Sequence, residues 1–333
     1  MSRRFIAIVS LLISLLFVSV IWQFAETFIH STIETAWGRL TGRPFNQIRL
    51  EDERGIPMQL YSSGEKHYNP LFIANEAKDE YFLRENPQHA ERFILLTDWL
   101  LEHGVETDST FYLNYDFDYP QYEMKAPWQS ALAQAVAMNA LAHRASYERD
   151  LVIYGKAIKA LNTLRPEVGH ISLALSDSTN WYMEYPASEP HYVLNGMMGV
   201  LFELNYYRII TKDPLAKELF DKGYRALLQK LPEFDYSGYS YYDLTGTKAG
   251  RMYHKKHIAQ LKRMNDIAPS PILQYYLMRW RRADSYPVLW QMVMNPRPKR
   301  LLAFFLPFFG LWWISFVLLG GTRKTGPEDP EHS

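Results

Sequence analysis

Four segments of the chain combine tyrosine and tryptophan with carboxylate, amide and cationic side chains. They cover residues 111–128, 180–195, 234–245 and 251–260. Carbohydrate-binding sites often have this composition, because flat aromatic faces suit sugar rings, although aromatic side chains also fill hydrophobic cores. The four segments are therefore the candidate functional site.

The charge balance limits the kinds of partner. The chain has 333 residues, and its 36 lysines and arginines balance 36 aspartates and glutamates. A neutral chain does not attract nucleic acid by bulk charge, so an acidic partner has to meet a local basic patch. Cysteine is absent, which excludes disulfide frameworks, thiolate zinc sites and cysteine nucleophiles.

The elements that must position these segments are mostly helical. Apolar spacing and capping residues predict helices over residues 88–102, 128–145, 151–164, 193–211 and 215–231. Strand signal is confined to short candidates within 45–60. Helices in successive pairs, joined by long aromatic loops, favour a mainly α fold of the α/α toroid type, an incomplete α/α barrel with a short N-terminal β segment.

Both ends of the chain are strongly apolar. Residues 5–22 would reach about 27 Å as a helix, close to the hydrocarbon thickness of a bilayer. We expect an uncleaved anchor there, with a cleaved signal peptide as the alternative. Residues 301–321 carry no charge, which predicts a second transmembrane helix.

The charges beside the two apolar runs bear on membrane orientation. Arg3 and Arg4 favour a cytoplasmic N-terminus and an extracytoplasmic middle, whereas Arg297, Lys299 and Arg300 favour the opposite. We expect the outward arrangement, because the first helix usually dominates. The predicted organisation is an anchor at 1–24, a linker with a short β segment at 25–66, a helical catalytic domain at 67–290, a transmembrane helix at 300–321 and a polar tail at 322–333.

The candidate segments contain motifs in a recognisable order. They are YNPLFIAN at 68–75, YDF at 115–117, PWQSALAQ at 127–134, EYP at 184–186, VLNG at 193–196, YDL at 242–244 and YHKKHIAQL at 253–261. This order resembles the glucuronyl C5-epimerases, which convert D-glucuronate to L-iduronate within a glycosaminoglycan such as heparosan. The resemblance covers roughly residues 67–265.

The implied reaction defines what the site must contain. Inverting C5 of a uronate removes a proton from the carbon next to a carboxylate and returns one on the opposite face, so two acid/base groups must flank the ring. Donors or cations must also stabilise the charge that builds on the carboxylate. The resemblance implies Glu184 and Tyr253 as the leading pair, with Tyr185 and Tyr242 lining the site and able to share proton transfer.

The same resemblance implies a set of substrate-binding residues, and no metal or other cofactor. The set is Tyr115, Trp128, Gln129, Asn195, Arg251, His254, Lys255, His257 and Gln260. Several have other interpretations. Asn195 could cap a helix, and His254 with His257 has the spacing of two metal ligands, although no third ligand is evident. Thr245 replaces the arginine that follows YDL in the family, and Arg251 could replace that arginine from nearby.

The sequence therefore predicts a membrane-anchored uronate C5-epimerase. Its expected partners are a heparosan-like acidic polysaccharide and the membrane, with no nucleic acid, and the resemblance implies relatives that form homodimers. Two alternatives stay open. A uronate lyase uses the same C5 abstraction followed by loss of the C4 substituent, and a non-catalytic glycan-binding scaffold would keep the fold without the activity.

Overall fold

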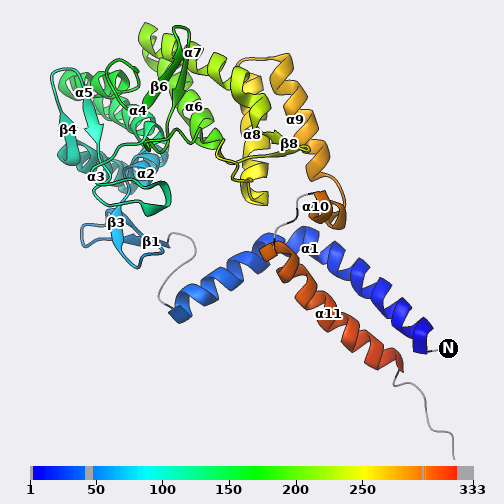
Figure 1. Cartoon of the computed structure of the whole chain (residues 1–333). Helices are drawn as coiled ribbons and strands as arrows, with labels where there is room; N and C mark the ends of the chain where they lie inside the picture. Colours follow the sequence, from blue (N-terminus) through cyan, green and yellow to red (C-terminus); the bar gives the residue numbers. More distant parts are fainter. Residues whose placement is uncertain (1–2, 42–47, 295, 297, 321–333) are drawn as a thin grey trace, which may run out of the picture. The chain divides into compact units, whose positions relative to one another are not determined.

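The computed structural model describes residues 3–41, 48–294, 296 and 298–320. These residues form two compact units, one within Met1–Ile33 and Arg282–Ser333 and the other within Glu34–Arg281. Most of the described chain is helical (Figure 1). The predicted mainly α class is therefore confirmed.

The first unit is built from the two ends of the chain. Figure 1 shows α1 (Arg3–Thr41) beside α11 (Pro298–Gly320). Their contact is apolar: Trp22 and Phe304 pack edge to face with ring centroids 5.6 Å apart, and Val18 and Phe308 belong to the same cluster. α10 (Val288–Met294) adds Val288 and Met292 to this cluster.

Two membrane spans were predicted, and this expectation is corrected to one. Among the described residues, Arg4–Trp22 is the one stretch long and apolar enough to cross a bilayer. The apolar stretch of α11, Phe304–Leu318, is shorter than the roughly 20 residues that a span needs. A membrane anchor and a signal sequence both have an N-terminal helix of this kind.

The second unit consists of helices joined in part by short hairpins. Its helices are α2 (Pro70–Phe82), α3 (Pro87–His103), α4 (Ala131–Glu148), α5 (Leu151–Asn162), α6 (Leu194–Thr211), α7 (Pro214–Lys230), α8 (Arg251–Ile267) and α9 (Pro271–Asp284). The unit ends at Arg281, within α9. Two 3-10 turns cover Pro120–Tyr122 and Leu231–Phe234. Its strands are β1 (Ile48–Glu51), β2 (Pro57–Leu60), β3 (Lys66–Tyr68), β4 (Gly104–Glu106), β5 (Phe111–Leu113), β6 (Ser172–Ser176), β7 (Thr179–Tyr182), β8 (Asp235–Tyr236) and β9 (Tyr239–Ser240). All the strand pairs are antiparallel.

α4 lies at the centre of this unit. It packs against α2, α5 and α6, and its alanines are buried around the helix because small side chains let neighbouring helices approach closely. The helix begins after Ser130, whose hydroxyl accepts from the Ala133 amide. It starts three residues later than expected, because Trp128 is paired with Tyr115 in a β-bridge.

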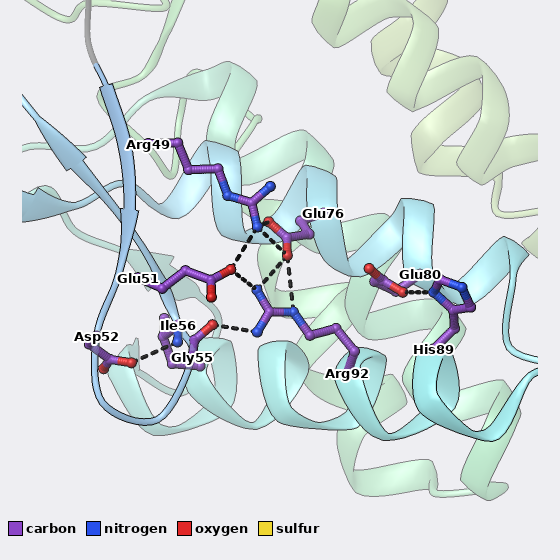
Figure 2. Close-up of polar contacts among 9 residues, drawn as sticks. All are labelled: Arg49, Glu51, Asp52, Gly55, Ile56, Glu76, Glu80, His89 and Arg92. Atoms are coloured by element: carbon purple, nitrogen blue, oxygen red, sulfur yellow. Dashed lines mark hydrogen bonds and ion pairs between the residues drawn. The ribbon is translucent and has the colours of Figure 1, made fainter.

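The N-terminal sheet is attached to the helices by charged side chains (Figure 2). Arg92 of α3 donates to the Glu76 carboxylate of α2 at 2.6 Å and to Glu51 of β1 at 3.0 Å, and also to the Gly55 carbonyl in the β1–β2 turn. Arg49 of β1 reaches the same Glu76 at 2.9 Å. The network ties β1 and the β1–β2 turn to α2 and α3, so it fixes where the chain enters the helical unit.

Candidate active site

Glu184 follows a hairpin that is fixed on both sides. The Met183 amide donates to the Ile171 carbonyl at 2.8 Å, and the Met183 carbonyl accepts the Ala131 amide of α4 at 2.9 Å. Tyr182, the last residue of β7, is buried and donates its hydroxyl to the Leu219 carbonyl at 2.6 Å. The backbone before Glu184 is therefore rigid, and it directs this carboxyl towards the start of α6.

The first turn of α6 receives the Glu184 side chain. A Cβ at Gly196 would lie 2.8 Å from the Glu184 Cβ, closer than real Cβ contacts come, so glycine is required there. Asn195 donates its side-chain amide to Glu184 Oε2 at 3.4 Å. The N-cap of α6 is Val193, so Asn195 lies inside the helix and contacts the carboxyl rather than capping.

Tyr242 and Tyr253 come from different elements and meet beside Glu184. The Tyr242 carbonyl accepts the Leu194 amide at 3.1 Å, which attaches the loop after β9 to the start of α6. Tyr253 lies in the first turn of α8. The two rings pack edge to face with centroids 4.8 Å apart. The negative charge of Glu184 raises the pKa of both hydroxyls.

Two further tyrosines complete the cluster from the 3-10 turn at Pro120–Tyr122. The Tyr122 ring stacks on Tyr185 with centroids 4.2 Å apart, and Tyr119 stacks on Tyr185 at 5.6 Å. Sequence reasoning missed both residues as site members. Their signal was the density of tyrosine around residues 115–122, which does not separate a site from a core.

Burial sets the protonation of Glu184. The side chain is 9% exposed, and burial raises its pKa to about 7, against the opposing effects of the Lys256 cation and a hydrogen bond from Tyr185. Near neutral pH this carboxyl is therefore part ionised and part protonated. A group in that condition can accept and release a proton at little cost.

The surrounding phenols stay protonated. Burial raises the pKa of Tyr253, of Tyr242 and of Tyr185, and the negative charge of Glu184 raises each of them further. Tyr253 lies close enough to Tyr242, Tyr242 to Tyr185, and Tyr185 to Glu184 for each side chain to affect the pKa of its neighbour. The four predicted catalytic residues thus lie together as one carboxyl and three neutral phenols.

α8 divides the predicted binding residues between two faces. Gln260 donates to the Asn195 carbonyl at 3.1 Å, so its face of the helix lies against α6 and the Glu184 cluster. Lys256, on the same face, is exposed and is the cation that acts on Glu184. The side-chain oxygens of Asn195 and Gln260 are buried with no hydrogen-bond partner among the described residues.

The structure does not bring His254 and His257 into the cluster. Both are buried on the side of α8 that packs against β9 and α9, where the Ser240 amide donates to His254 Nδ1 at 3.1 Å and the Ser240 hydroxyl lies 2.8 Å from His257 Nδ1. Both rings also lie near Trp280. Both histidines therefore lie in a buried contact of α8 with β9 and α9, and their role in substrate binding stays a prediction.

The remaining predicted residues lie behind the cluster or at its edge. Tyr115 and Trp128 are buried and stack with centroids 3.9 Å apart, and Gln129 donates to Asn114. Arg251 is half-buried as the first residue of α8, and Lys255 is exposed. Tyr115 and Trp128 thus form a rigid wall, while the two cations flank Tyr253 in sequence.

Thr245 has a local role. Its hydroxyl donates to Asp243 Oδ1 at 2.6 Å, and the Thr247 amide donates to the same oxygen at 3.3 Å. Asp243 is 2% exposed. The threonine therefore shapes the loop that carries Tyr242, and it brings no positive charge to the site.

The chain is similar to several known proteins. An uncharacterized protein of Methanocaldococcus jannaschii is 27% identical over 214 residues, covering 59% of this chain and 70% of the relative. The D-glucuronyl C5-epimerase of Caenorhabditis elegans is 25% identical over 215 residues, covering 58% of this chain and 35% of the relative. This chain thus matches about a third of the length of the nematode enzyme.

Among solved structures, a GH76 alpha-mannanase of Bacteroides thetaiotaomicron matches 79% of this chain and 72% of its own, with a TM-score of 0.44 and 12% identity. A TM-score below 0.5 does not establish a shared fold. The D-glucuronyl C5-epimerase C-terminus family matches residues 107–282, a range that contains Glu184, its phenols and Lys256. The chain therefore belongs to the D-glucuronyl C5-epimerase C-terminus family.

Proposed function

We propose that this chain is a C5-epimerase that converts D-glucuronate to L-iduronate residues within a heparosan-like acidic polysaccharide. The observation that carries the proposal is the placement of Glu184, with a pKa raised to about 7, inside a cluster of protonated tyrosines. Such a pair supplies a base and an acid of different kinds to one sugar ring. Family membership supports the same reaction class.

In the proposed reaction, ionised Glu184 removes the C5 proton. The two electrons of the C–H bond then form an enolate-like dianion with the uronate carboxylate. A neutral phenol, Tyr253 or Tyr242, delivers a proton to the opposite face of C5 and becomes a phenolate. The raised pKa values of the phenols fit this acid role, because they keep a proton on the tyrosine at neutral pH.

One turnover leaves Glu184 protonated and a tyrosine ionised, so the site has to be reset. The chain of interactions from Glu184 through Tyr185 and Tyr242 to Tyr253 offers the route. A proton that passes along it restores the carboxylate and the phenol together. The O–H groups along this route exchange with water, so in deuterated water the reset supplies the phenol with a deuteron.

Substrate contacts are proposed from the groups around the cluster. Lys256 faces the developing charge on the uronate carboxylate and takes over the role of the family arginine that Thr245 replaces, with Arg251 and Lys255 at the same edge. The buried side-chain oxygens of Asn195 and Gln260 accept hydrogen bonds from sugar hydroxyls. Gln129 and the aromatic wall of Tyr115 and Trp128 support the ring of the next sugar.

We further propose that the N-terminal part of α1 anchors the protein in a membrane and that the helical unit lies on the extracytoplasmic side. The hydropathy of Arg4–Trp22 supports the anchor. The α/α toroid remains our interpretation of the helix pairs, and a homodimer remains an expectation from the family.

Incubation with heparosan in deuterated water tests the proposal. NMR should show deuterium at C5 together with iduronate, and Glu184→Gln should abolish both. Glu189→Gln is the matched control, because Glu189 is an exposed carboxylate five residues later in the same loop. No deuterium at C5 with the unmodified chain would refute the heparosan form of the proposal, and an ultraviolet-absorbing unsaturated uronate would assign the chain as a lyase.

A further inference from the structure

The helical unit has a cavity that shares no residue with the Glu184 cluster. Its volume is about 720 Å³. It opens where α2, α4 and α6 end and α5 begins. The lining residues are Tyr81, Phe82, Arg84, Ala142, His143, Ala145, Ser146, Arg149, Asp150, Leu151, Tyr154, Tyr206, Ile210 and Thr211.

One wall of this cavity is a fixed aromatic stack. The rings of Tyr81 and His143 lie parallel with centroids 3.9 Å apart, and the Tyr206 hydroxyl is 3.0 Å from His143 Nε2. The Arg84 guanidinium lies over the Tyr81 ring, with its carbon 3.9 Å from the ring centre. It also donates to the Tyr81 carbonyl at 2.7 Å. The wall therefore carries a guanidinium group.

The rim of the cavity is apolar and exposed. Leu151 is 83% exposed, Phe82 57% and Ile210 42%. Their sequence neighbours Val152, Leu83 and Ile209 are exposed as well. A group of large apolar side chains around one cavity mouth is typical of a surface that contacts a membrane or a partner.

Positive charge accompanies this rim. Arg84 and the exposed Arg149 line the cavity. One carboxylate, Asp150, also lines the cavity, where it accepts the Val152 amide at 2.7 Å as the cap of α5, and Glu148 pairs with Arg144 at 2.8 Å. The lining thus holds two guanidinium groups against one carboxylate. Two guanidinium groups beside an apolar rim match an amphiphile with an anionic head.

We propose that this end of the helical unit docks on an anionic phospholipid surface, with Arg84 and Arg149 meeting a lipid phosphate and the apolar rim entering the interface. The aromatic wall then contacts the glycerol and the first methylene groups. A saccharide is the weaker match, because the side chains of Leu151, Ile210 and Phe82 have no hydrogen-bonding groups for sugar hydroxyls. The docking surface is independent of the reaction at Glu184.

Hydrogen–deuterium exchange on the full chain in nanodiscs tests this proposal. Nanodiscs of phosphatidylcholine alone are compared with nanodiscs that also contain phosphatidylglycerol. Peptides covering 81–84, 149–154 and 206–211 should exchange more slowly only when phosphatidylglycerol is present. Arg149→Gln should reduce this protection about fivefold, the expected loss for one basic residue near an anionic surface.

Leu151→Asp should remove the protection, and its exposed position keeps the fold intact. Ile272→Asp is the matched control, because Ile272 is an exposed apolar residue in the first turn of α9, outside the cavity. Equal exchange in the two nanodiscs would overturn the proposal. It would also fail if heparosan oligosaccharides protected the same peptides in phosphatidylcholine nanodiscs, because the cavity would then bind saccharide.

Discussion

The cation at Lys256 should control the pH at which the enzyme becomes active. Burial raises the pKa of Glu184 to about 7, and the Lys256 cation opposes that rise. Lys256→Gln removes the opposing charge, so the carboxylate becomes less stable and its pKa increases. Because the proposed reaction needs ionised Glu184 to remove the C5 proton, the rate should rise with pH through this pKa, and the rise should move to higher pH.

The size of the shift follows from the exposure of Lys256. An opposite charge within ~4–6 Å typically lowers the pKa of a carboxyl by about 1–3 units. The lysine is exposed and its field is screened by solvent, so the lower end, about one unit, applies. At pH 7 the ionised fraction of Glu184 would fall from about half to about a tenth, which slows deuterium incorporation about fivefold.

The measurement is the pH profile of kcat/KM for C5 deuterium exchange, which reports the free enzyme. Its midpoint separates the electrostatic effect from weaker substrate binding, because binding alone changes the height of the profile. Lys256→Arg should restore the midpoint. Lys255→Gln is the control, since Lys255 is equally exposed and adjacent but exerts no resolved effect on Glu184. An unchanged midpoint in Lys256→Gln, or an equal shift in Lys255→Gln, would refute the reasoning.

Two other substitutions probe the same cluster. Gly196→Ala places a methyl group against Glu184, so C5 exchange should fall at least about tenfold with an unfolding free energy lowered by about 1–3 kcal/mol. Gly199→Ala, on the same helix, is the control, because its methyl group meets Leu132 instead. This variant should keep its activity in the same exchange and melting assays. Equal activity losses in the two variants would count against a positioning role for Gly196. Tyr253→Phe removes a proton donor and should lower kcat by about 10²–10⁴-fold without lowering the melting temperature, and exchange at the normal rate would remove Tyr253 from the mechanism.

Much of the helical framework follows from local sequence patterns. Asp213 and Pro214 predict the start of α7, and Asp213 indeed accepts the Leu215 amide at 2.8 Å. α3 begins at Pro87 as expected. These features depend on residues three or four apart, so periodicity and capping chemistry suffice to find them. The hairpins beyond residue 60 were missed because two- to five-residue strands have too few alternating positions to give a signal.

The apolar C-terminal run shows a limit of composition. Residues 301–321 were expected to cross a membrane, whereas among the described residues the apolar stretch of α11 covers Phe304–Leu318 alone. One face of this helix buries Phe304 and Phe308 against α1. An uncharged run therefore does not distinguish a helix that packs on another helix from one that faces lipid on all sides.

The amino-acid order alone indicated the family, because its motifs place a carboxyl and several phenols in the order of a known family. Only the tertiary structure decided which of those groups lie together. It turned Tyr253, Lys256 and Gln260 towards Glu184 and turned His254 and His257 into the core. The physical reason is that the side chains of one helix point in different directions, and long-range packing, here the contact of α8 with α6 and Ser240, selects the face that meets the site.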